Sequence, residues 1–415
     1  MEKVQLFGMP AEKGRWLLIP LSITILLCLG TVYSWSIFRK PLEKLLNVGA
    51  TDSLLPFTVL LVVFAILMPI TGFYINRFDT RLITGVGGLI TALGYILSSL
   101  GGNIPTLTIT YGVIAGMGVG IAYGVPLAVV AKWFPDKKGL AVGATVIGFG
   151  LSPLITAPLA KFLIDAFGVR QTFVILGIAF AAIITAISTI LTTPPQGWQP
   201  EGWTPPVAIK ANSHTTTSGS ILQTSSFYGL WFCYTIGSFA GLAAIGISSP
   251  LAQEIIKLDA ATAANTVSLF AVFNGAGRLF FGWFTDKFTP KLGAIVSFVF
   301  ILIASIMMLN AGKGSVLTYI VAFSLFYLAL GGWLAIAPTS TLIIFQPQDY
   351  AKNYGIVFTA YGMGALGGTL LAGKIRDIFG SYTNFFYPTA GLAIVGIILA
   401  VFTLKRTSSD ADLVT

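Results

Sequence analysis

Arg278 is the residue whose chemistry most needs an explanation, because it is a fixed positive charge within the apolar, glycine-rich stretch FNGAGRLFFGWFTDKF. A guanidinium presents a planar fork of hydrogen-bond donors that matches a carboxylate, and it keeps its charge in proteins. At the centre of a membrane, an uncompensated charge costs at least about 2.5–3.5 kcal/mol. We expect Arg278 to bind an anionic ligand. The alternative is a structural arginine satisfied by carbonyls or by a carboxylate on another helix.

Asn274 precedes Arg278 by one helical turn and therefore lies on the same helix face. Its amide can hold the arginine or bond a hydroxyl group of a ligand, and a plain helix-contact asparagine is the alternative. No Asp or Glu occurs deep in the other apolar runs, so the chain offers Arg278 no fixed counter-ion. The missing counter-ion would then be the ligand itself.

The composition places these residues in a membrane protein. Of 415 residues, 55% are hydrophobic and only 9% are charged, and the mean hydropathy is +0.86. A soluble domain usually has about 25% charged residues. The net charge of +9 does not indicate a nucleic-acid partner, because the basic residues are scattered singly through short loops. Their modest excess on one side predicts a multi-pass protein of the lipid bilayer, in a cell inner or plasma membrane, with both termini cytoplasmic.

We expect an all-α integral membrane protein with twelve transmembrane helices, each about 20 residues long. The first apolar run is too long for a signal-peptide core and has no small-residue cleavage site after it, so it is expected to be a retained helix. The expected spans are 16–38, 54–76, 82–101, 106–131, 139–164, 170–192, 226–253, 262–284, 291–311, 315–343, 354–375 and 382–404.

The two halves of the chain repeat each other. When the two halves of the sequence are aligned, Gly72 corresponds to Gly282, and Asp165 corresponds to Asp377. Such a repeat is typical of secondary transporters that work by alternating access. The expected domains are a six-helix bundle at 1–192, a cytoplasmic linker at 193–225 that is rich in Pro, Gly, Ser and Thr, and a second six-helix bundle at 226–415.

Other residue patterns predict packing or no special role. Glycines recur every fourth residue in the fourth span, and such a stripe lets helix backbones approach closely in lipid. Cys28 and Cys233 lie in apolar runs, so neither a disulfide nor a metal site is expected, and His214 lies in a polar stretch without a partner nearby. The four glycines of the stripe are Gly112, Gly116, Gly120 and Gly124.

We expect no enzyme activity and no cofactor.

Four segments, YSWSIF, KWFPDKKGLAVG, NGAGRLFFGWFTDK and KNYGIVFTAYGMGALGG, together resemble the oxalate:formate antiporter family of the major facilitator superfamily. The resemblance covers almost the whole chain. It implies a central cavity in which Arg278 holds the substrate carboxylate and Tyr123 is a cavity tyrosine. In the related monocarboxylate transporters this helix carries Asp-x-x-x-Arg, and here the spacing survives as Asn274-x-x-x-Arg278.

The departures from that family indicate a different substrate. The lysine of the oxalate exchanger corresponds to Tyr361, and its aromatic Trp and Tyr correspond to Leu330 and Leu334. One positive charge with apolar walls suits a monocarboxylate such as lactate or pyruvate better than oxalate. The expected substrate-binding residues are Arg278, Asn274, Tyr123, Tyr361, Leu330, Leu334, Cys28, Phe358 and Tyr327.

The expected function is therefore secondary active transport of small monocarboxylates by a monomer, with proton symport as the favoured coupling. Because Asn replaces the family's Asp beside the arginine, the proton would need another group, and Lys374, Asp377 and Asp259 are the candidates. An exchanger of two carboxylates would have the same sequence features. A sugar or drug porter fits less well because few polar groups are available, and a non-transporting receptor would bind without flux.

Overall fold

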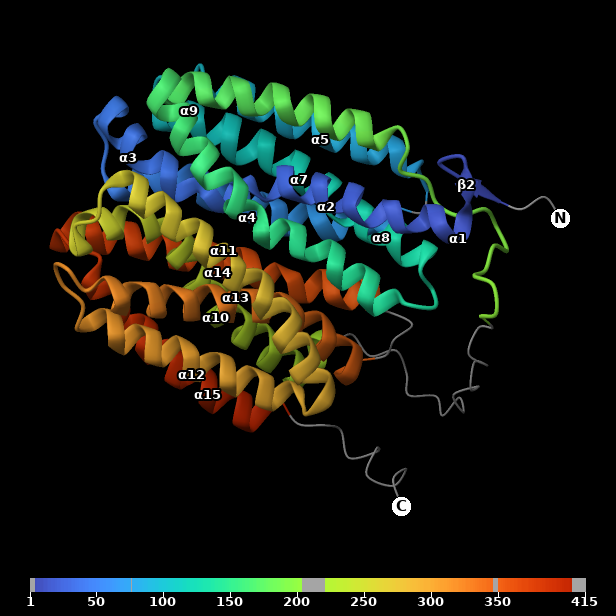
Figure 1. Cartoon of the computed structure of the whole chain (residues 1–415). Coiled ribbons are helices and arrows are strands. Elements are labelled where there is room, and N and C mark those ends of the chain that lie inside the picture. Colours follow the sequence, from blue (N-terminus) through green and yellow to red (C-terminus); the bar gives the residue numbers. More distant parts are fainter. Residues whose placement is uncertain (1–3, 76, 204–220, 346–349, 405–415) are drawn as a thin grey trace.

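The computed structural model describes residues 4–75, 77–203, 221–345 and 350–404, and the regular secondary structure within these ranges is helical apart from one small hairpin (Figure 1). The hairpin pairs strand β1 (Gln5–Leu6) with strand β2 (Met9–Pro10) in antiparallel register. His214 lies outside the described residues. Helices predominate because a backbone in lipid must satisfy its hydrogen bonds within its own segment.

The first half of the chain runs from α1 to α9. Its elements are α1 (Ala11–Gly14), η1 (Arg15–Leu17), α2 (Leu18–Leu29), η2 (Gly30–Ser34), α3 (Trp35–Leu46), α4 (Ala50–Tyr74), α5 (Thr80–Ser98), α6 (Ile104–Leu107), the π-helix η3 (Thr108–Ala115), α7 (Gly116–Ala122), α8 (Gly124–Trp133) and α9 (Lys138–Ser188).

The second half runs from η4 to α15. Its elements are η4 (Ile221–Gln223), α10 (Ser225–Leu251), the π-helix η5 (Ala252–Ile256), α11 (Ala260–Lys287), α12 (Pro290–Leu309), α13 (Val316–Ile344), α14 (Tyr350–Phe379), η7 (Thr383–Phe385) and α15 (Phe386–Thr403).

Among the described residues, eleven helical stretches are long and apolar enough to cross a membrane. We expected twelve spans. The difference arises at α9, where the spans expected at 139–164 and 170–192 form one stretch with a break inside it. Gly168 has a φ of 80° and a ψ of 164°, a conformation that glycine adopts readily, and it separates two helices.

The first stretch is also longer than expected, because it continues to Leu46 instead of ending at Phe38. This places Arg39 inside a membrane-length helix, fully buried. Arg39 and Arg278 are therefore both buried arginines within membrane-length helices.

The glycine stripe packs as expected along most of its length. A side chain at Gly112 would lie 2.9 Å from Val59 Cβ, one at Gly116 would lie 3.0 Å from the Leu60 carbonyl oxygen, and one at Gly120 would lie 2.8 Å from Leu67 Cβ. These neighbours all belong to α4, so the stripe allows close contact between the two helices. Gly124, the last of the four, has open space beside it.

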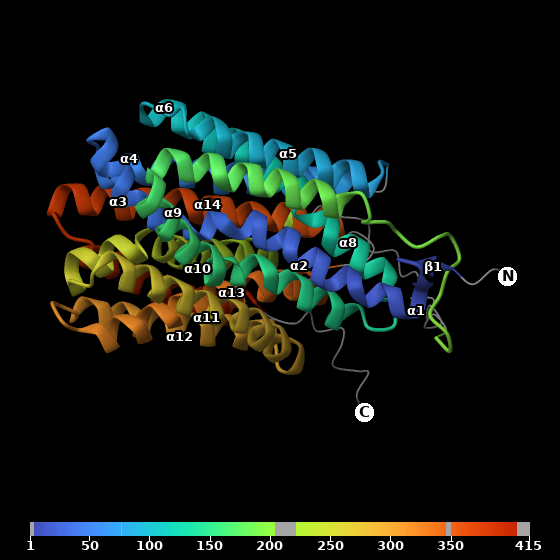
Figure 2. The ribbon, with the colours of Figure 1, turned by 45° about the horizontal axis from the view of Figure 1, so that its top comes forward.

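Figure 1 shows α2–α9 on one side of the assembly and α10–α15 on the other, and Figure 2 again places α5 and α12 at opposite edges. The halves meet mainly where α4 packs against α14, α9 against α11, and α3 against α10. We call the end of the bundle that carries α1 and the end of α15 the terminal end. The opposite end, which carries the loops at 47–49, 257–259 and 380–382, is called the far end.

Candidate functional site

Arg278 lies on α11 where this helix packs against α9 of the other half, and only 5% of its surface is exposed. Its Nη1 donates a hydrogen bond to the carbonyl oxygen of Val146 on α9, at 3.0 Å. Its Nη2 lies 3.5 Å from Asn274 Oδ1, and its Nε has no partner among the described residues. A carbonyl thus satisfies part of the guanidinium, as the structural alternative anticipated, while a buried donor remains unused.

Asn274 is fully buried one turn before Arg278, and its amide is used at both ends. Its Nδ2 donates to the backbone carbonyl of Tyr327 on α13, at 3.2 Å, while its Oδ1 faces the arginine. Asn274 therefore combines two of the roles expected for it: it is a helix-contact residue that also helps to hold Arg278.

Tyr361 and Tyr33 connect the two halves next to this arginine. Their hydroxyl groups lie 2.7 Å apart, and both side chains are buried, Tyr361 on α14 and Tyr33 on η2. The positive charge of Arg278 acts on the hydroxyl groups of Tyr33, Tyr234 and Tyr354. Three neutral phenol groups thus lie within electrostatic range of the arginine.

An aromatic cluster extends the same region. The ring of Phe64 on α4 lies 5.1 Å from that of Tyr123, 5.6 Å from that of Phe358 and 5.8 Å from that of Tyr361. Phe149 on α9 packs edge-on against both Tyr33 and Tyr123, at 5.1 Å in each case. Three expected residues, Tyr123, Phe358 and Tyr361, therefore lie together in one cluster.

The other expected site residues lie at different distances from this cluster. Tyr327 is linked to it through its backbone carbonyl, which accepts from Asn274, and its hydroxyl lies 3.3 Å from Ser248 Oγ. Leu330 packs against Gly241 of α10, and Leu334 on the same helix is only partly buried. Cys28 is a buried free thiol on α2.

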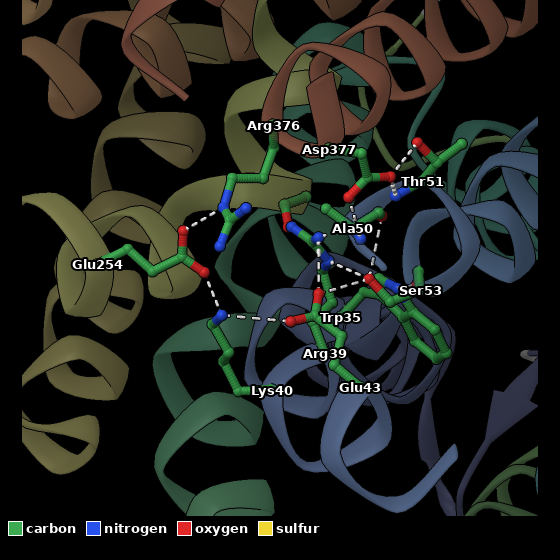
Figure 3. A network of polar contacts seen from close by, with 11 residues as sticks. Trp35, Arg39, Lys40, Glu43, Ala50, Thr51, Ser53, Glu254, Arg376 and Asp377 are labelled. Atoms are coloured by element: carbon green, nitrogen blue, oxygen red, sulfur yellow. Dashed lines mark hydrogen bonds and ion pairs between the residues drawn. The ribbon is translucent and has the colours of Figure 1, made fainter. Parts of the chain in front are cut away.

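A network of charged groups joins the halves at the far end (Figure 3). Glu254 on η5 accepts from Arg376 Nε on α14, at 2.6 Å, and it forms an ion pair with Lys40 on α3. Lys40 in turn pairs with Glu43 at 3.2 Å. Glu254 thus lies between a cation of its own half and a cation of the other half. We call Lys40, Glu43, Glu254 and Arg376 the far-end network.

Arg39 lies beside this network, and its hydrogen bonds go to side chains of its own half and to backbone carbonyls. Its Nε donates to Ser53 Oγ at 3.0 Å, and its Nη2 donates to Glu43 Oε1 at 2.9 Å. Its Nη1 donates across the interface to the carbonyl oxygen of Gly246, at 3.1 Å. Unlike Arg278, Arg39 has an acceptor for each of its three nitrogens, which suits a structural role.

The residues expected to carry a proton lie at the far end, away from Arg278. Asp377 accepts from the backbone N–H groups of Ala50 and Thr51, at 2.8 and 2.9 Å, so it caps α4 of the other half. Asp259 caps its own helix α11, and the hydrogen bond from the Thr262 hydroxyl lowers the pKa of its carboxyl group. Lys374 is exposed on α14.

Several residues of this region were not predicted from the sequence. Tyr33 belongs to the segment YSWSIF, whose likeness to other carriers was noticed without assigning the tyrosine a role. Val146 takes part through its backbone, which no residue-type pattern reveals. The neighbours of the site that the sequence analysis missed are Tyr33, Phe64, Val146, Phe149, Gly150 and Tyr234.

Comparison with known proteins defines the class. A sequence model described as the Major Facilitator Superfamily matches residues 20–344 and 230–414, and the chain belongs to this family of membrane transporters. Two solved structures share the fold over 94% of the chain. They are a bacterial homologue of the human lysosomal transporter Spinster in an inward-facing and occupied conformation, with a TM-score of 0.70 at 14% identity, and the nucleoside transporter NupG, with a TM-score of 0.73 at 13% identity.

Relatives of known type narrow the class further. The oxalate:formate antiporter of Oxalobacter formigenes is 29% identical over 396 residues, which cover 95% of this chain and 92% of that protein. Human monocarboxylate transporter 12 is 25% identical over 338 residues, which cover 72% of this chain and 63% of that protein. The chain is thus a transporter similar to the oxalate:formate and monocarboxylate carriers, and not an enzyme.

Proposed function

We propose that this protein transports small monocarboxylates such as lactate or pyruvate, by alternating access around Arg278. The observation that carries the proposal is the unused Nε donor of a guanidinium that is 95% buried at the interface between the halves. A carboxylate supplies both the missing hydrogen-bond acceptor and the missing negative charge.

The surroundings of Arg278 favour one carboxylate over two. The position that corresponds to the second cation of the oxalate exchanger is Tyr361, whose hydroxyl is already engaged with Tyr33. The nearby rings of Phe64, Phe149 and Phe358 are apolar. A dianion would therefore bury one charge without a partner, whereas a short alkyl end fits beside aromatic rings.

The expected orientation gives the far-end network a role. With both termini in the cytoplasm, the far end faces the outside, and the ion pair between Lys40 and Glu254 holds the halves together there. Opening the outer face requires that this pair separates. The alternating movement would then exchange contacts of the far-end network for contacts at the terminal end.

Charge balance favours coupling to a proton. One carboxylate moving alone carries a negative charge against the membrane potential, at about 2.3 kcal/mol per 100 mV. A proton moving with the acid removes this cost. Asp377, Asp259 and Lys374 remain the proposed proton-carrying candidates, and Glu254 joins them because it is an acidic group whose cationic neighbours lie on both halves.

The second candidate function is exchange of two carboxylates. It is favoured by the similarity to the oxalate:formate antiporter, which covers almost the whole chain. Exchange and symport share the same binding site, and they differ in whether the carrier can return without a substrate.

Uptake into proteoliposomes tests the proposal. Labelled lactate uptake is measured with and without an inward proton gradient, and the external pH and the membrane current are recorded. Symport predicts uptake with external alkalinisation and little current, whereas uptake only into vesicles preloaded with a carboxylate would identify an exchanger.

Substitution of the arginine tests the binding site. Arg278→Lys keeps the charge but loses the planar fork, so uptake should fall at least about tenfold while the protein remains monodisperse in detergent. Arg39→Lys is the matched control. It also removes a buried guanidinium, but one whose three nitrogens all have hydrogen-bond acceptors in the protein. Near-normal uptake by Arg278→Lys or Arg278→Ala would contradict carboxylate pairing.

A further inference from the structure

The far-end network is a row of alternating charges, and only its middle contact joins the two halves (Figure 3). Glu43 and Lys40 belong to α3 of the first half, whereas Glu254 and Arg376 belong to η5 and α14 of the second. Lys40 binds Glu254 Oε1 across the interface. Among the ion pairs formed between described residues, this one alone connects the halves. We call it the crossing pair.

Each member of the crossing pair also has an ionic partner in its own half. Lys40 Nζ lies 3.2 Å from Glu43 Oε2. Glu254 uses its second oxygen, Oε2, to accept from Arg376 Nε at 2.6 Å. The four side chains are between 13% and 32% exposed, so water reaches all of them. Neither member therefore depends on the opposite half for its only partner.

The order of the charges lets the two outer members of the row weaken the crossing pair. Glu43 and Glu254 are second neighbours in the row, and they repel each other across the interface. Lys40 and Arg376 do the same. The attraction between Glu43 and Arg376 joins the two ends of the row, and it is weaker because Coulomb energy falls with distance. Separating the halves thus loses one close attraction and relieves two repulsions.

We propose that Glu43 and Arg376 compete for the two members of the crossing pair and thereby set how readily the far end opens. Lys40 and Glu254 hold this end closed, and their partners in each half keep the closure reversible. The inference deepens the proposed function, because it rests on alternating access, but it does not depend on which substrate is carried.

The test measures opening through a buried position at the interface. Ser36 lies one helical turn before Lys40, is 1% exposed, and has its Oγ 3.0 Å from Ser248 Oγ of the other half. A cysteine at this position should react with a bulky maleimide only when the halves separate. The labelling rate of purified Ser36→Cys protein, in a background without Cys28 and Cys233, therefore follows the fraction of open molecules.

Four substitutions in that background should fall into two opposite classes. Lys40→Gln and Glu254→Gln remove the crossing pair, so labelling should become at least about threefold faster. Glu43→Gln and Arg376→Gln remove a competitor, so labelling should become about twofold slower. If labelling in these last two variants is faster than in the parent or equal to it, the inference is overturned.

A structural role of Glu43 is the competing explanation, because its Oε1 also accepts from Arg39 and Ser53. The double variant Glu43→Gln/Glu254→Gln distinguishes the two roles. Competition predicts that it labels like Glu254→Gln alone, since no crossing pair is left to weaken. If Glu43→Gln slows labelling equally with and without Glu254, the structural role is correct and the inference fails.

Asp165→Asn is the matched control, because it removes an ion pair that lies within α9, and its labelling should equal that of the parent. If Glu43→Gln does not insert into the membrane, Arg376→Gln tests the same competition from the other half. The two proposals fail separately. The expected labelling pattern without lactate uptake would refute only the proposed substrate, whereas faster labelling in all four variants of a lactate carrier would refute only this inference.

Discussion

The hydroxyl groups of Tyr33 and Tyr361 meet at 2.7 Å across the interface between the two halves. Both side chains are buried, and each packs against a ring of the aromatic cluster, Tyr33 against Phe149 and Tyr361 against Phe358. Because the two tyrosines belong to different halves, this hydrogen bond forms or breaks when the halves move relative to each other.

Removing one of these two hydroxyl groups should lower the stability of the protein more than removing both. In Tyr361→Phe the buried Tyr33 hydroxyl loses its partner, which costs about 1–3 kcal/mol, whereas replacing both partners is close to neutral. We expect thermal stability in detergent to fall in each single Phe variant and to recover largely in Tyr33→Phe/Tyr361→Phe. A double variant whose loss is the sum of the two single losses would show that the hydroxyls do not interact.

Tyr361→Lys should weaken monocarboxylate transport. The ammonium group would lie among Tyr33, Phe64 and Phe358 without an acidic partner, and a singly charged ligand could compensate only one of the two cations. We expect lactate uptake to fall and oxalate to compete with lactate more strongly than in the wild type. Unchanged uptake together with unchanged oxalate competition would show that this position does not influence the substrate.

Glu254→Gln should favour opening of the far end. The substitution removes the negative charge shared by Lys40 and Arg376, so Arg376 loses its ion pair and Lys40 keeps only its pair with Glu43 of its own half. If the closed state loses about 1.4 kcal/mol of stability relative to the open state, the ratio of closed to open molecules falls about tenfold. Distances between spin labels at Lys44→Cys and Lys313→Cys, in a background without Cys28 and Cys233, measure this change.

The matched control for that experiment is Asp165→Asn. Asp165 pairs with Lys161 at the same end of the molecule, but both residues lie on α9, so the pair does not join the halves. The control should leave the label distances unchanged. Equal shifts in both variants would indicate a general effect of surface charge.

The N-terminal segment should detach from the bundle at low pH. Arg15 donates to both carboxylate oxygens of Asp136, at 2.5 and 3.0 Å, and this hydrogen bonding holds the pKa of Asp136 below its ordinary value of 3.8. A carboxyl whose pKa is lowered by folding contributes stability above its unfolded pKa and loses it as the pH falls through the folded pKa. The contact should therefore be constant at neutral pH and be lost only below about pH 3.8.

Asp136→Asn should remove this pH dependence and weaken the contact by about 1–3 kcal/mol at neutral pH. Trp198 of the following segment lies 4.8 Å from Trp133, so tryptophan fluorescence reports whether this region stays packed. Glu12→Gln is the control, because Glu12 contacts Arg15 from the same helical stretch. A wild-type transition that persists in Asp136→Asn would assign the pH dependence to another group.

Much of the fold could be predicted because long apolar runs have few alternatives in a membrane. The predicted helix ends were wrong where a polar residue ends the apolar pattern but the helix continues beyond it. Arg39 ends the apolar pattern but not the helix, since Ser53, Glu43 and the Gly246 carbonyl satisfy its charge. The break at Gly168 falls between the spans expected at 139–164 and 170–192, so the sequence did indicate this pair of helix ends.

The site could be predicted only in part. Arg278 and Asn274 were recognised because they share one helix face, and a single sequence displays that relationship directly. Val146 and Gly150 could not be recognised, because one acts through its backbone and the other through the absence of a side chain. Both properties depend on which helix packs opposite, and that information lies in the folded structure.

Asp377 supplies the first turn of α4 with hydrogen-bond acceptors from the opposite half of the molecule, at the N–H groups of Ala50 and Thr51. When the halves separate at the far end, these two N–H groups lose their acceptor and become available to water. Their deuterium uptake should therefore report the fraction of time that the far end is open. Hydrogen–deuterium exchange at the start of α4, measured by mass spectrometry on the unmodified chain, would then follow the transport cycle without an attached label.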